Sequence, residues 1–345
     1  MLLLPSVAAP GFSFVYEDFN ELTKSQQMAL FKAIKQDLFP EDPDRIDKLL
    51  RSIREARFAS GIGCVHCGST FVKRNGKYRS RQRYLCKDCN KTFNDMTNTP
   101  FSGSKYPEKW VKFIELMIEG VTLPKIAKRL KIHISTAFYW RHKILKAIGS
   151  LGFKQLEGIV ESDETFFRES LKGRRVINHR KAKKRGEKDK KRGISNLKVA
   201  VVVAQDRNGN TIARKAGIGR VKAEEIDAVI GDFIHPSALL CTDTATNYKK
   251  FAKIKGLLHE TINGRQKQRV KKGIYHIQHV NNFHNRLKLW MERFQGVGTY
   301  YLDNYLYWFR WLEIGKNMEF DKRVEQMIIS ACQRCNYHTV EMIRS

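Results

Sequence analysis

The sequence predicts a multidomain α/β protein, and three observations lead to that prediction. The chain has 345 residues, enough for two to four domains of roughly 100–200 residues each. Four cysteines form two close pairs in its first hundred residues, and basic helical segments follow them. After residue 155, apolar strand-like runs come in series and then alternate with helical segments, a pattern typical of a mixed sheet flanked by helices.

The net charge of the chain is strongly positive. Lysine and arginine total 64 against 35 aspartate and glutamate residues, a formal net charge of +29. This excess predicts a polyanionic partner, with nucleic acid as the first candidate and a ribosome-associated role as an alternative. No apolar run reaches the roughly 18 residues of a membrane span, and no basic amphipathic anchor stands out, so we expect no membrane partner.

Residues 1–57 are predicted to form a helical N-terminal arm. The short apolar start has no basic region before it, so we interpret it as part of this arm rather than as a signal peptide. Apolar residues recur at helical spacing over 22–39 and 46–58, with a proline-containing break between them, and Asp18 is a candidate cap for the first helix.

Residues 58–98 carry two Cys-x-x-Cys pairs and predict a four-cysteine zinc ribbon. Each pair lets two thiolates reach one tetrahedral ion from a tight turn, so two pairs close the shell and make the zinc structural rather than catalytic. Asn75-Gly76 between the pairs predicts a hairpin turn, and a short strand follows the second pair. The predicted ligands are Cys64, Cys67, Cys86 and Cys89.

Residues 105–150 predict a helix-turn-helix DNA-binding domain. One amphipathic helix ends at Gly120, a second begins after Thr122, and a third, capped by Ser135, is basic. An ordinary helical hairpin is the alternative. Five residues of the third helix are predicted to face DNA: Thr136, Tyr139, Arg141, His142 and Lys143.

Residues 155–315 predict one α/β domain in which two carboxylates follow buried strands. Asp163 comes after an apolar strand, and Asp243 ends another. Carboxylates that meet at one edge of a sheet suit a pair of Mg²⁺ ions, which can activate a water or 3′ hydroxyl toward a phosphodiester. In a strand, Glu161 points the same way as Asp163 and is a possible supporting residue, whereas Glu164 points to the other face and is expected in a surface ion pair.

One basic insertion, at about 171–195, interrupts this domain. The insertion carries twelve lysines or arginines over 171–193 and lacks a core pattern, so we expect a surface loop that either clamps DNA or is simply solvated.

The tail at 316–345 is unassigned. Its Cys332 and Cys335 face no second pair, so free thiols are expected.

Three blocks of this domain resemble the DDE-type transposases of insertion sequences. They are ESDETFF at 161–167, LLCTDTATNYKKF at 239–251, and the segment 276–309. With the ribbon and helices, the resemblance covers about residues 60–315 and is nearest to the branch with an N-terminal zinc ribbon, insertion-sequence family fifteen ninety-five. It implies a ribonuclease-H-like catalytic domain that uses Mg²⁺ or Mn²⁺ to hydrolyse DNA at element ends and to join the 3′ ends to a target.

The resemblance also assigns the catalytic residues. Asp163 and Asp243 take the first two acidic positions. Aligning Lys288 with the family's basic residue puts Asn281 where Glu is usual, giving an Asp-Asp-Asn-Lys variant with Asn281 as the third Mg²⁺ ligand. No carboxylate occurs between Glu260 and Glu292. His284, one turn after Asn281, is the rival third residue, but an imidazole suits a hard ion less well than an amide oxygen.

The sequence thus predicts a transposase that binds double-stranded DNA, both the inverted-repeat ends of its element and the target. Two alternatives remain open: a non-enzymatic DNA-binding transcriptional regulator, and an inactive transposase relic. By analogy we expect a homo-oligomer on paired ends, located in the bacterial cytoplasm with the nucleoid. His276 and His279 are expected to touch DNA or hold their loop rather than bind metal.

Overall fold

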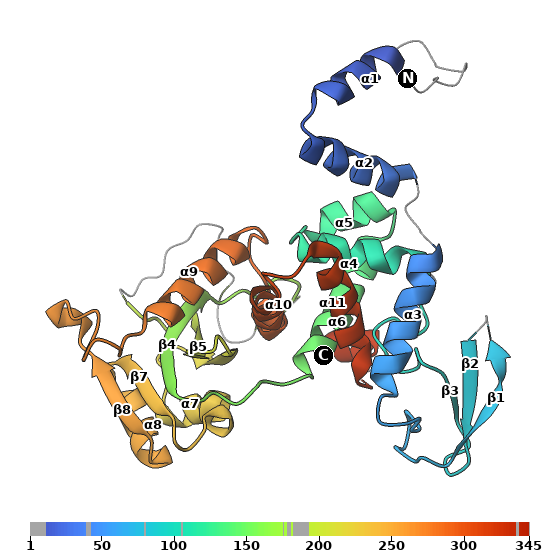
Figure 1. Cartoon of the computed structure of the whole chain (residues 1–345). Helices are drawn as coiled ribbons and strands as arrows, with labels where there is room; N and C mark the ends of the chain where they lie inside the picture. Colours follow the sequence, from blue (N-terminus) through green and yellow to red (C-terminus); the bar gives the residue numbers. More distant parts are fainter. Residues whose placement is uncertain are drawn as a thin grey trace.

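The computed structural model describes residues 12–38, 43–78, 81–104, 106–174, 176–177, 181, 193–335 and 338–344. Its parts are arranged in chain order as N-terminal helices, a small cysteine-rich sheet, a helical body and a sheet domain (Figure 1). Most of the predicted basic insertion lies outside the described residues. Within the described stretches, every helix is too short or too polar to cross a lipid bilayer.

The N-terminal helices do not form one unit. Helices α1 (Phe12–Glu21) and α2 (Lys24–Leu38) extend away from the rest of the chain (Figure 1), whereas α3 (Pro43–Arg57) packs against the body with Leu49 and Ile53 buried. The predicted cap at Asp18 is wrong, because α1 begins six residues earlier and contains this residue. The helical prediction itself is confirmed.

The cysteine-rich sheet has three antiparallel strands, β1 (Val72–Tyr78), β2 (Arg81–Cys86) and β3 (Thr92–Phe93). The predicted turn at Asn75-Gly76 is wrong, since both residues lie within β1. There the register shifts by one residue between Arg74 and Lys77, and Gly76 has φ +66°, so the pair forms a bulge and the chain reverses after Tyr78.

The helical body contains α4 (Trp110–Ile118), α5 (Leu123–Leu130) and α6 (Ile134–Gly149), joined by two C-terminal helices, α11 (Phe320–Gln333) and α12 (Val340–Arg344). Helix α11 packs against α3, α4 and α6, so the segment that the sequence left unassigned belongs to this core. The predicted cap of α6 at Ser135 is wrong: His133 precedes the helix, and its ring accepts the Ser135 N–H.

The sheet domain has five strands: β4 (Ile159–Arg168), β5 (Lys198–Asp206), β6 (Thr211–Ile218), β7 (Leu239–Asp243) and β8 (Leu258–Ile262). Their order is β6-β5-β4-β7-β8, with β5 antiparallel to both neighbours and β4, β7 and β8 parallel. This is a mixed, ribonuclease-H-like sheet, as the resemblance implies. Strand β8 was not predicted, because its five residues are mostly polar.

Helices cover both faces of this sheet. Helices α7 (Ala223–Ile230) and α8 (Thr246–Lys255) pack on one face with Ala200, Val202 and Ala204 of β5. Helices α9 (Gln278–Glu292) and α10 (Leu302–Ile314) pack on the other, where alternate β5 residues join the core of the helical body. The apolar residues of β5 are buried on both faces, so one continuous core links the second face to α4, α6 and α11.

Candidate active site and zinc site

The two predicted carboxylates lie on neighbouring parallel strands. Strand β4 pairs with β7 from Ile159 opposite Leu239 to Glu161 opposite Cys241, and two further steps of that register bring Asp163 level with Asp243. Asp243 ends β7 as predicted. Asp163, however, lies in the middle of β4 rather than after its end, because β5 keeps pairing with β4 up to Arg168.

A pocket of about 810 Å³ opens where β7 stops and β4 continues. Beyond Glu161, β4 has no strand partner on its β7 side among the described residues, so the open edge of Asp163–Arg168 forms one wall. Helix α9 forms the facing wall. Its contributions are Asn281, His284, Asn285 and Lys288.

Several carboxylates lie close to Asp163, although Arg168, Lys198 and Lys288 also line the pocket. Burial, the nearby Glu164 and Asp243 together raise the pKa of Asp163 to about 7, although Lys288 opposes the rise. Burial also raises the pKa of Glu164. Because Glu164 and Asp243 repel the charge of Asp163, a divalent cation beside these carboxylates would relieve the repulsion, and the donor set of hard oxygens fits Mg²⁺ or Mn²⁺.

Glu164 differs from its prediction. It forms no surface ion pair among the described residues; its carboxylate accepts a hydrogen bond from Asn247 Nδ2 at 2.7 Å, and it lines the pocket beside Asp163. The reason is that α8 begins at Thr246, directly after β7, and brings Asn247 to the face on which Glu164 lies. The sequence did not indicate this contact.

Helix α9 brings the other predicted residues to the same pocket. Asn281 and Lys288 are exposed pocket residues, whereas His284 is only 5% exposed. The Nδ1 atom of His284 lies 3.9 Å from Asp163 Oδ2, and burial together with Lys288 lowers the pKa of His284 to about 4. At neutral pH its ring is therefore uncharged. The catalytic roles of Asn281, His284 and Lys288 stay predictions.

Glu161 anchors the start of α9. This carboxylate is fully buried; its Oε2 accepts the backbone N–H of His279 at 2.8 Å and that of Val280 at 3.3 Å. A negative charge at a helix N-terminus satisfies free N–H groups and favours the helix dipole. Glu161 lies two residues before Asp163, so the strand that carries the first carboxylate also fixes the helix that faces it.

A cluster around Glu161 has the composition of a metal site but holds an arginine. Ligand atoms of Glu161, His276 and His279 lie within 4.8 Å of one another. Arg207 Nη1 lies 2.7 Å from Glu161 Oε1, 2.9 Å from His276 Nε2 and 2.7 Å from His279 Nδ1. The guanidinium occupies the position that a metal ion would take between these three side chains. This agrees with the expectation that the histidines hold their loop and do not bind metal.

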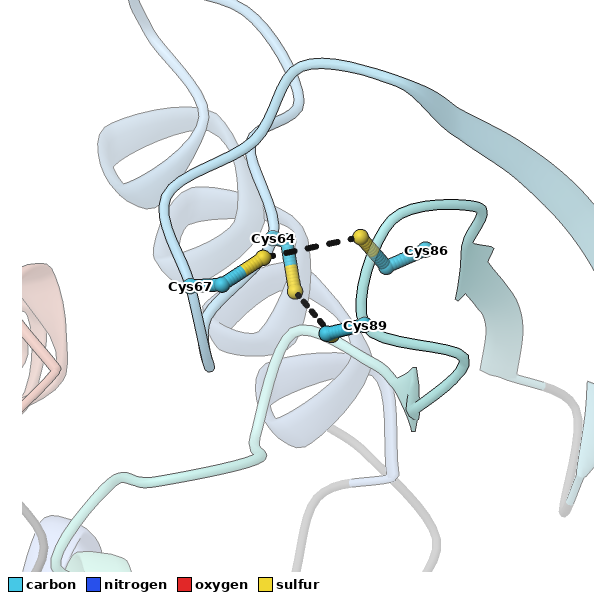
Figure 2. A group of neighbouring side chains, drawn as sticks. All are labelled: Cys64, Cys67, Cys86 and Cys89. Carbon is cyan, nitrogen blue, oxygen red and sulfur yellow. Dashed lines mark hydrogen bonds between the residues drawn. The ribbon is translucent and has the colours of Figure 1, made fainter.

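The four cysteines of the ribbon converge on one point. Their Sγ atoms all lie within 4.8 Å of one another, and Cys64–Cys89 and Cys67–Cys86 are each 3.6 Å apart (Figure 2). Tetrahedral zinc with Zn–S bonds of about 2.3 Å needs sulfurs about 3.8 Å apart, whereas a disulfide needs about 2.0 Å. The geometry fits a four-thiolate zinc site.

We expect Cys86→Ser to release about one equivalent of zinc and to unfold the ribbon, because a site with three thiolates loses most of its binding free energy. Cys335→Ser is the matched control, since Cys335 is exposed and outside the cluster. Zinc content by mass spectrometry and the melting of the chain measure the effect. Full zinc occupancy in Cys86→Ser would contradict the assignment.

Two of the predicted DNA-contacting residues on α6 are buried, so that prediction is wrong for both. Arg141 is 0% exposed, donates to the Val121 carbonyl at 2.6 Å, and lies 4.8 Å from the Trp308 ring. His142 is 1% exposed, and its Nδ1 lies 2.9 Å from Asn304 Nδ2. Both side chains connect α6 to α10.

The other three predicted residues are half-buried, and α12 lies near them. The Tyr139 hydroxyl contacts Arg344 of α12, and the neighbouring Lys146 reaches the Met342 carbonyl. Thr136 and Lys143 stay predictions. Helices α5 and α6 pack against each other across a short turn; a DNA-binding helix-turn-helix is not shown, and it stays a prediction.

The second Cys-x-x-Cys motif is not part of a metal cluster among the described residues. Cys332 is buried in the helical core, where burial raises the pKa of its thiol to about 12, and Cys335 is exposed. The expectation of free thiols stays a prediction.

A five-stranded mixed sheet with a carboxylate pair on its adjacent central strands places residues 155–315 in the ribonuclease-H-like class of folds. Residues 155–313 match the model of the ISXO2-like transposase domain, so this part of the chain is similar to the domains of that family.

Comparison with individual proteins gives three further findings. An uncharacterized protein in transposable element ISH50 of Halobacterium salinarum is 32% identical over 158 residues, 45% of this chain and 53% of that protein. The match therefore spans about half the length of this relative. A pre-cleavage Mos1 transpososome structure covers 63% of this chain and 77% of its own at 12% identity and a TM-score of 0.21. The match to a structure of the Mos1 mariner paired end complex with Mn covers 94% of this chain and 93% of the Mos1 chain, at 12% identity and a TM-score of 0.21.

Proposed function

We propose that the protein is an active transposase that cleaves DNA at the ends of its own element and joins the freed 3′ ends to a target. The observation that carries the proposal is the proximity of Asp163 and Asp243 on neighbouring parallel strands, within the region that resembles a transposase domain. The ISH50 relative is named as part of a transposable element, which supports the same function here.

Asp163 and Asp243 would hold the divalent metal, with Asn281 as the third ligand from α9. When bound, Mg²⁺ or Mn²⁺ supplies a polarised phosphoryl group and an activated water or 3′ hydroxyl. The chain's own residues set the conditions for this. Asp163 must lose its proton to become a ligand, and Asp243 is held in place by the Ala245 N–H, which donates to its Oδ1 at 2.9 Å.

Asn281 rather than His284 is our choice for the third ligand. Both line the pocket. The amide oxygen of Asn281 is a hard donor on an exposed side chain, whereas His284 is buried and offers a softer nitrogen. Lys288, exposed at the same wall, would contact a phosphate near the cut as a point charge.

The substrate would be double-stranded DNA held largely by charge. The net charge of +29 supports binding of a polyanion to the protein surface. The zinc ribbon and helices α5 and α6 are the proposed contacts to the element ends. Pairing of two ends would require at least two copies of the chain. A bacterial origin has no support in these findings, because the ISH50 relative is archaeal.

A cleavage and joining assay separates this proposal from its alternatives. A duplex with the inverted repeat that flanks the gene is incubated with the full chain and Mg²⁺ or Mn²⁺, and Asp243→Ala serves as the inactive comparison. We expect metal-dependent nicks at the element end and joined products from the parent chain, and end binding without cutting from Asp243→Ala. Binding without cutting by the parent chain would instead favour a regulator or an inactive relic.

A further inference from the structure

Two buried polar atoms in the pocket have no hydrogen-bond partner among the described residues. They are the Thr165 hydroxyl, on a residue 2% exposed, and His284 Nε2, on a residue 5% exposed. Both residues line the pocket, one from β4 and one from α9. Buried polar groups are nearly always paired, and leaving one unpaired costs about 1–3 kcal/mol. These atoms therefore indicate a ligand that supplies their partners.

The pocket has room for a ligand beyond the metal site. Its volume of about 810 Å³ lies within the range of roughly 300–1,000 Å³ that accommodates a molecule of nucleotide size. It continues along β4 from Asp163 to Arg168, because β7 ends before this stretch and leaves the edge uncovered. Thr165 thus lies two residues from the first carboxylate, on the same face of the strand.

The lining changes in chemistry along this path. The carboxylates lie at one end, and the middle carries hydrogen-bonding groups, namely the Thr165 hydroxyl, the His284 ring and the Asn285 amide. Phe166 and Phe167 add apolar surface. Arg168 and Lys288 are exposed cations on the two walls. Side-chain hydrogen-bonding groups suit a base, and exposed cations suit the phosphates of the strand that carries it.

We propose that this pocket is a nucleotide subsite that receives one unstacked base of the DNA strand beside the scissile phosphodiester, with Thr165 Oγ1 and His284 Nε2 hydrogen-bonding that base. The inference rests on the proposed function, because it places the base next to the bond that the carboxylates would cleave. Extracting a base costs a few kcal/mol of stacking and pairing, and contacts in such a pocket offset that cost.

The test uses duplexes that carry the element end with 2-aminopurine, a base whose fluorescence rises on unstacking, at single positions on either side of the cut. They are bound to Asp243→Ala, so that no cutting occurs. We expect fluorescence to rise severalfold at one position. In the same background, Thr165→Val should weaken binding of the intact duplex about three- to tenfold, the effect of one lost hydrogen bond, but not of a duplex abasic at that position.

Two variants control for loss of structure. Thr165→Ser keeps the hydroxyl and should recover most of the lost affinity. Thr211→Val removes the hydroxyl of another buried threonine of the sheet, outside the pocket, and should change neither duplex. No rise at any position, or equal weakening of intact and abasic duplexes by Thr165→Val, would overturn the subsite. Failure of the proposed function is distinct: the parent chain would not cut with metal, whatever the fluorescence shows.

Discussion

Replacing Asp163 with asparagine is expected to abolish strand cleavage and, at the same time, to stabilise the metal-free protein above pH 7. The loss of activity should be at least about a thousandfold, since a neutral amide cannot supply the ligand charge. The stabilisation follows from the raised pKa of Asp163, about 7 against an ordinary value of 3.8, whose first cause is burial and whose second is the neighbouring Glu164.

The sign of this effect follows from proton linkage. Between about pH 4 and pH 7 the folded state holds the Asp163 proton more tightly than the unfolded chain does, so the free energy of unfolding falls as the pH rises through this window. The full fall has an upper limit on the order of 4 kcal/mol. Asparagine has no proton to lose, so the Asp163→Asn variant should keep its stability where the parent chain loses it.

Melting temperatures at pH 5 and pH 8 measure the difference. Chelators are omitted because they would remove zinc from the ribbon, and Asp232→Asn, at an exposed aspartate of the same domain, is the control. Added Mn²⁺ should raise the melting temperature of the parent chain more at pH 8 than at pH 5, and should leave Asp163→Asn unchanged. A variant that still cuts, or one that melts like the parent at both pH values, would contradict the assignment.

The residues of this site differ in how far the sequence could predict them. The apolar runs before Asp163 and Asp243 predict the buried strands that carry them, but the two residues come together only through the parallel pairing of β4 with β7. Asn281, His284 and Lys288 share one helix at spacings of three and four residues, so their common wall also follows from the sequence. The unpaired hydroxyl of Thr165 could not be predicted from the sequence. It depends on β7 ending at Asp243, two residues after its last pairing with β4.

Long-range packing explains the residues that the sequence misplaced. Arg141 and His142 occupy a basic helix, and a basic helix in a basic chain suggests DNA contact. Their burial is set by Asn304 and Trp308, about 160 residues later in the chain, which local periodicity cannot reveal. Glu164 was misplaced for the same reason, since its partner Asn247 lies on α8. In each case the polar side chain is satisfied by an element that the local pattern does not identify.

Replacing Glu161 with alanine is expected to destabilise the sheet domain by about 1–3 kcal/mol, the cost of leaving buried hydrogen-bonding groups without their acceptor. Arg207 would lose its 2.7 Å contact with Glu161 Oε1, and the N–H groups of His279 and Val280 would lose their acceptor. Helix α9 provides no side-chain cap of its own at Ile277, so Glu161 on β4 performs that role from a distant part of the chain.

The effect on cleavage should exceed the effect on folding. Frayed at its first turn, α9 would no longer hold Asn281 and Lys288 opposite Asp163, and a small displacement of catalytic groups can cost about a hundredfold in rate. Glu161→Gln separates the two contributions, because its amide oxygen can still accept the helix N–H groups although the charge facing Arg207 is lost. We therefore expect Glu161→Gln to keep more of the α9 structure than Glu161→Ala does.

Hydrogen exchange of the first turn of α9, melting of the full chain and the cleavage rate together test this role. Glu224→Gln, at a surface ion pair with Lys250, is the matched control and should alter none of the three. If Glu161→Ala left the amides of His279 and Val280 as protected as in the parent chain, Glu161 would not be the anchor of α9. If exchange rose throughout the sheet rather than first in α9, Glu161 would be an ordinary core residue, and the coupling of the Asp163 strand to the Asn281 helix would have to lie elsewhere.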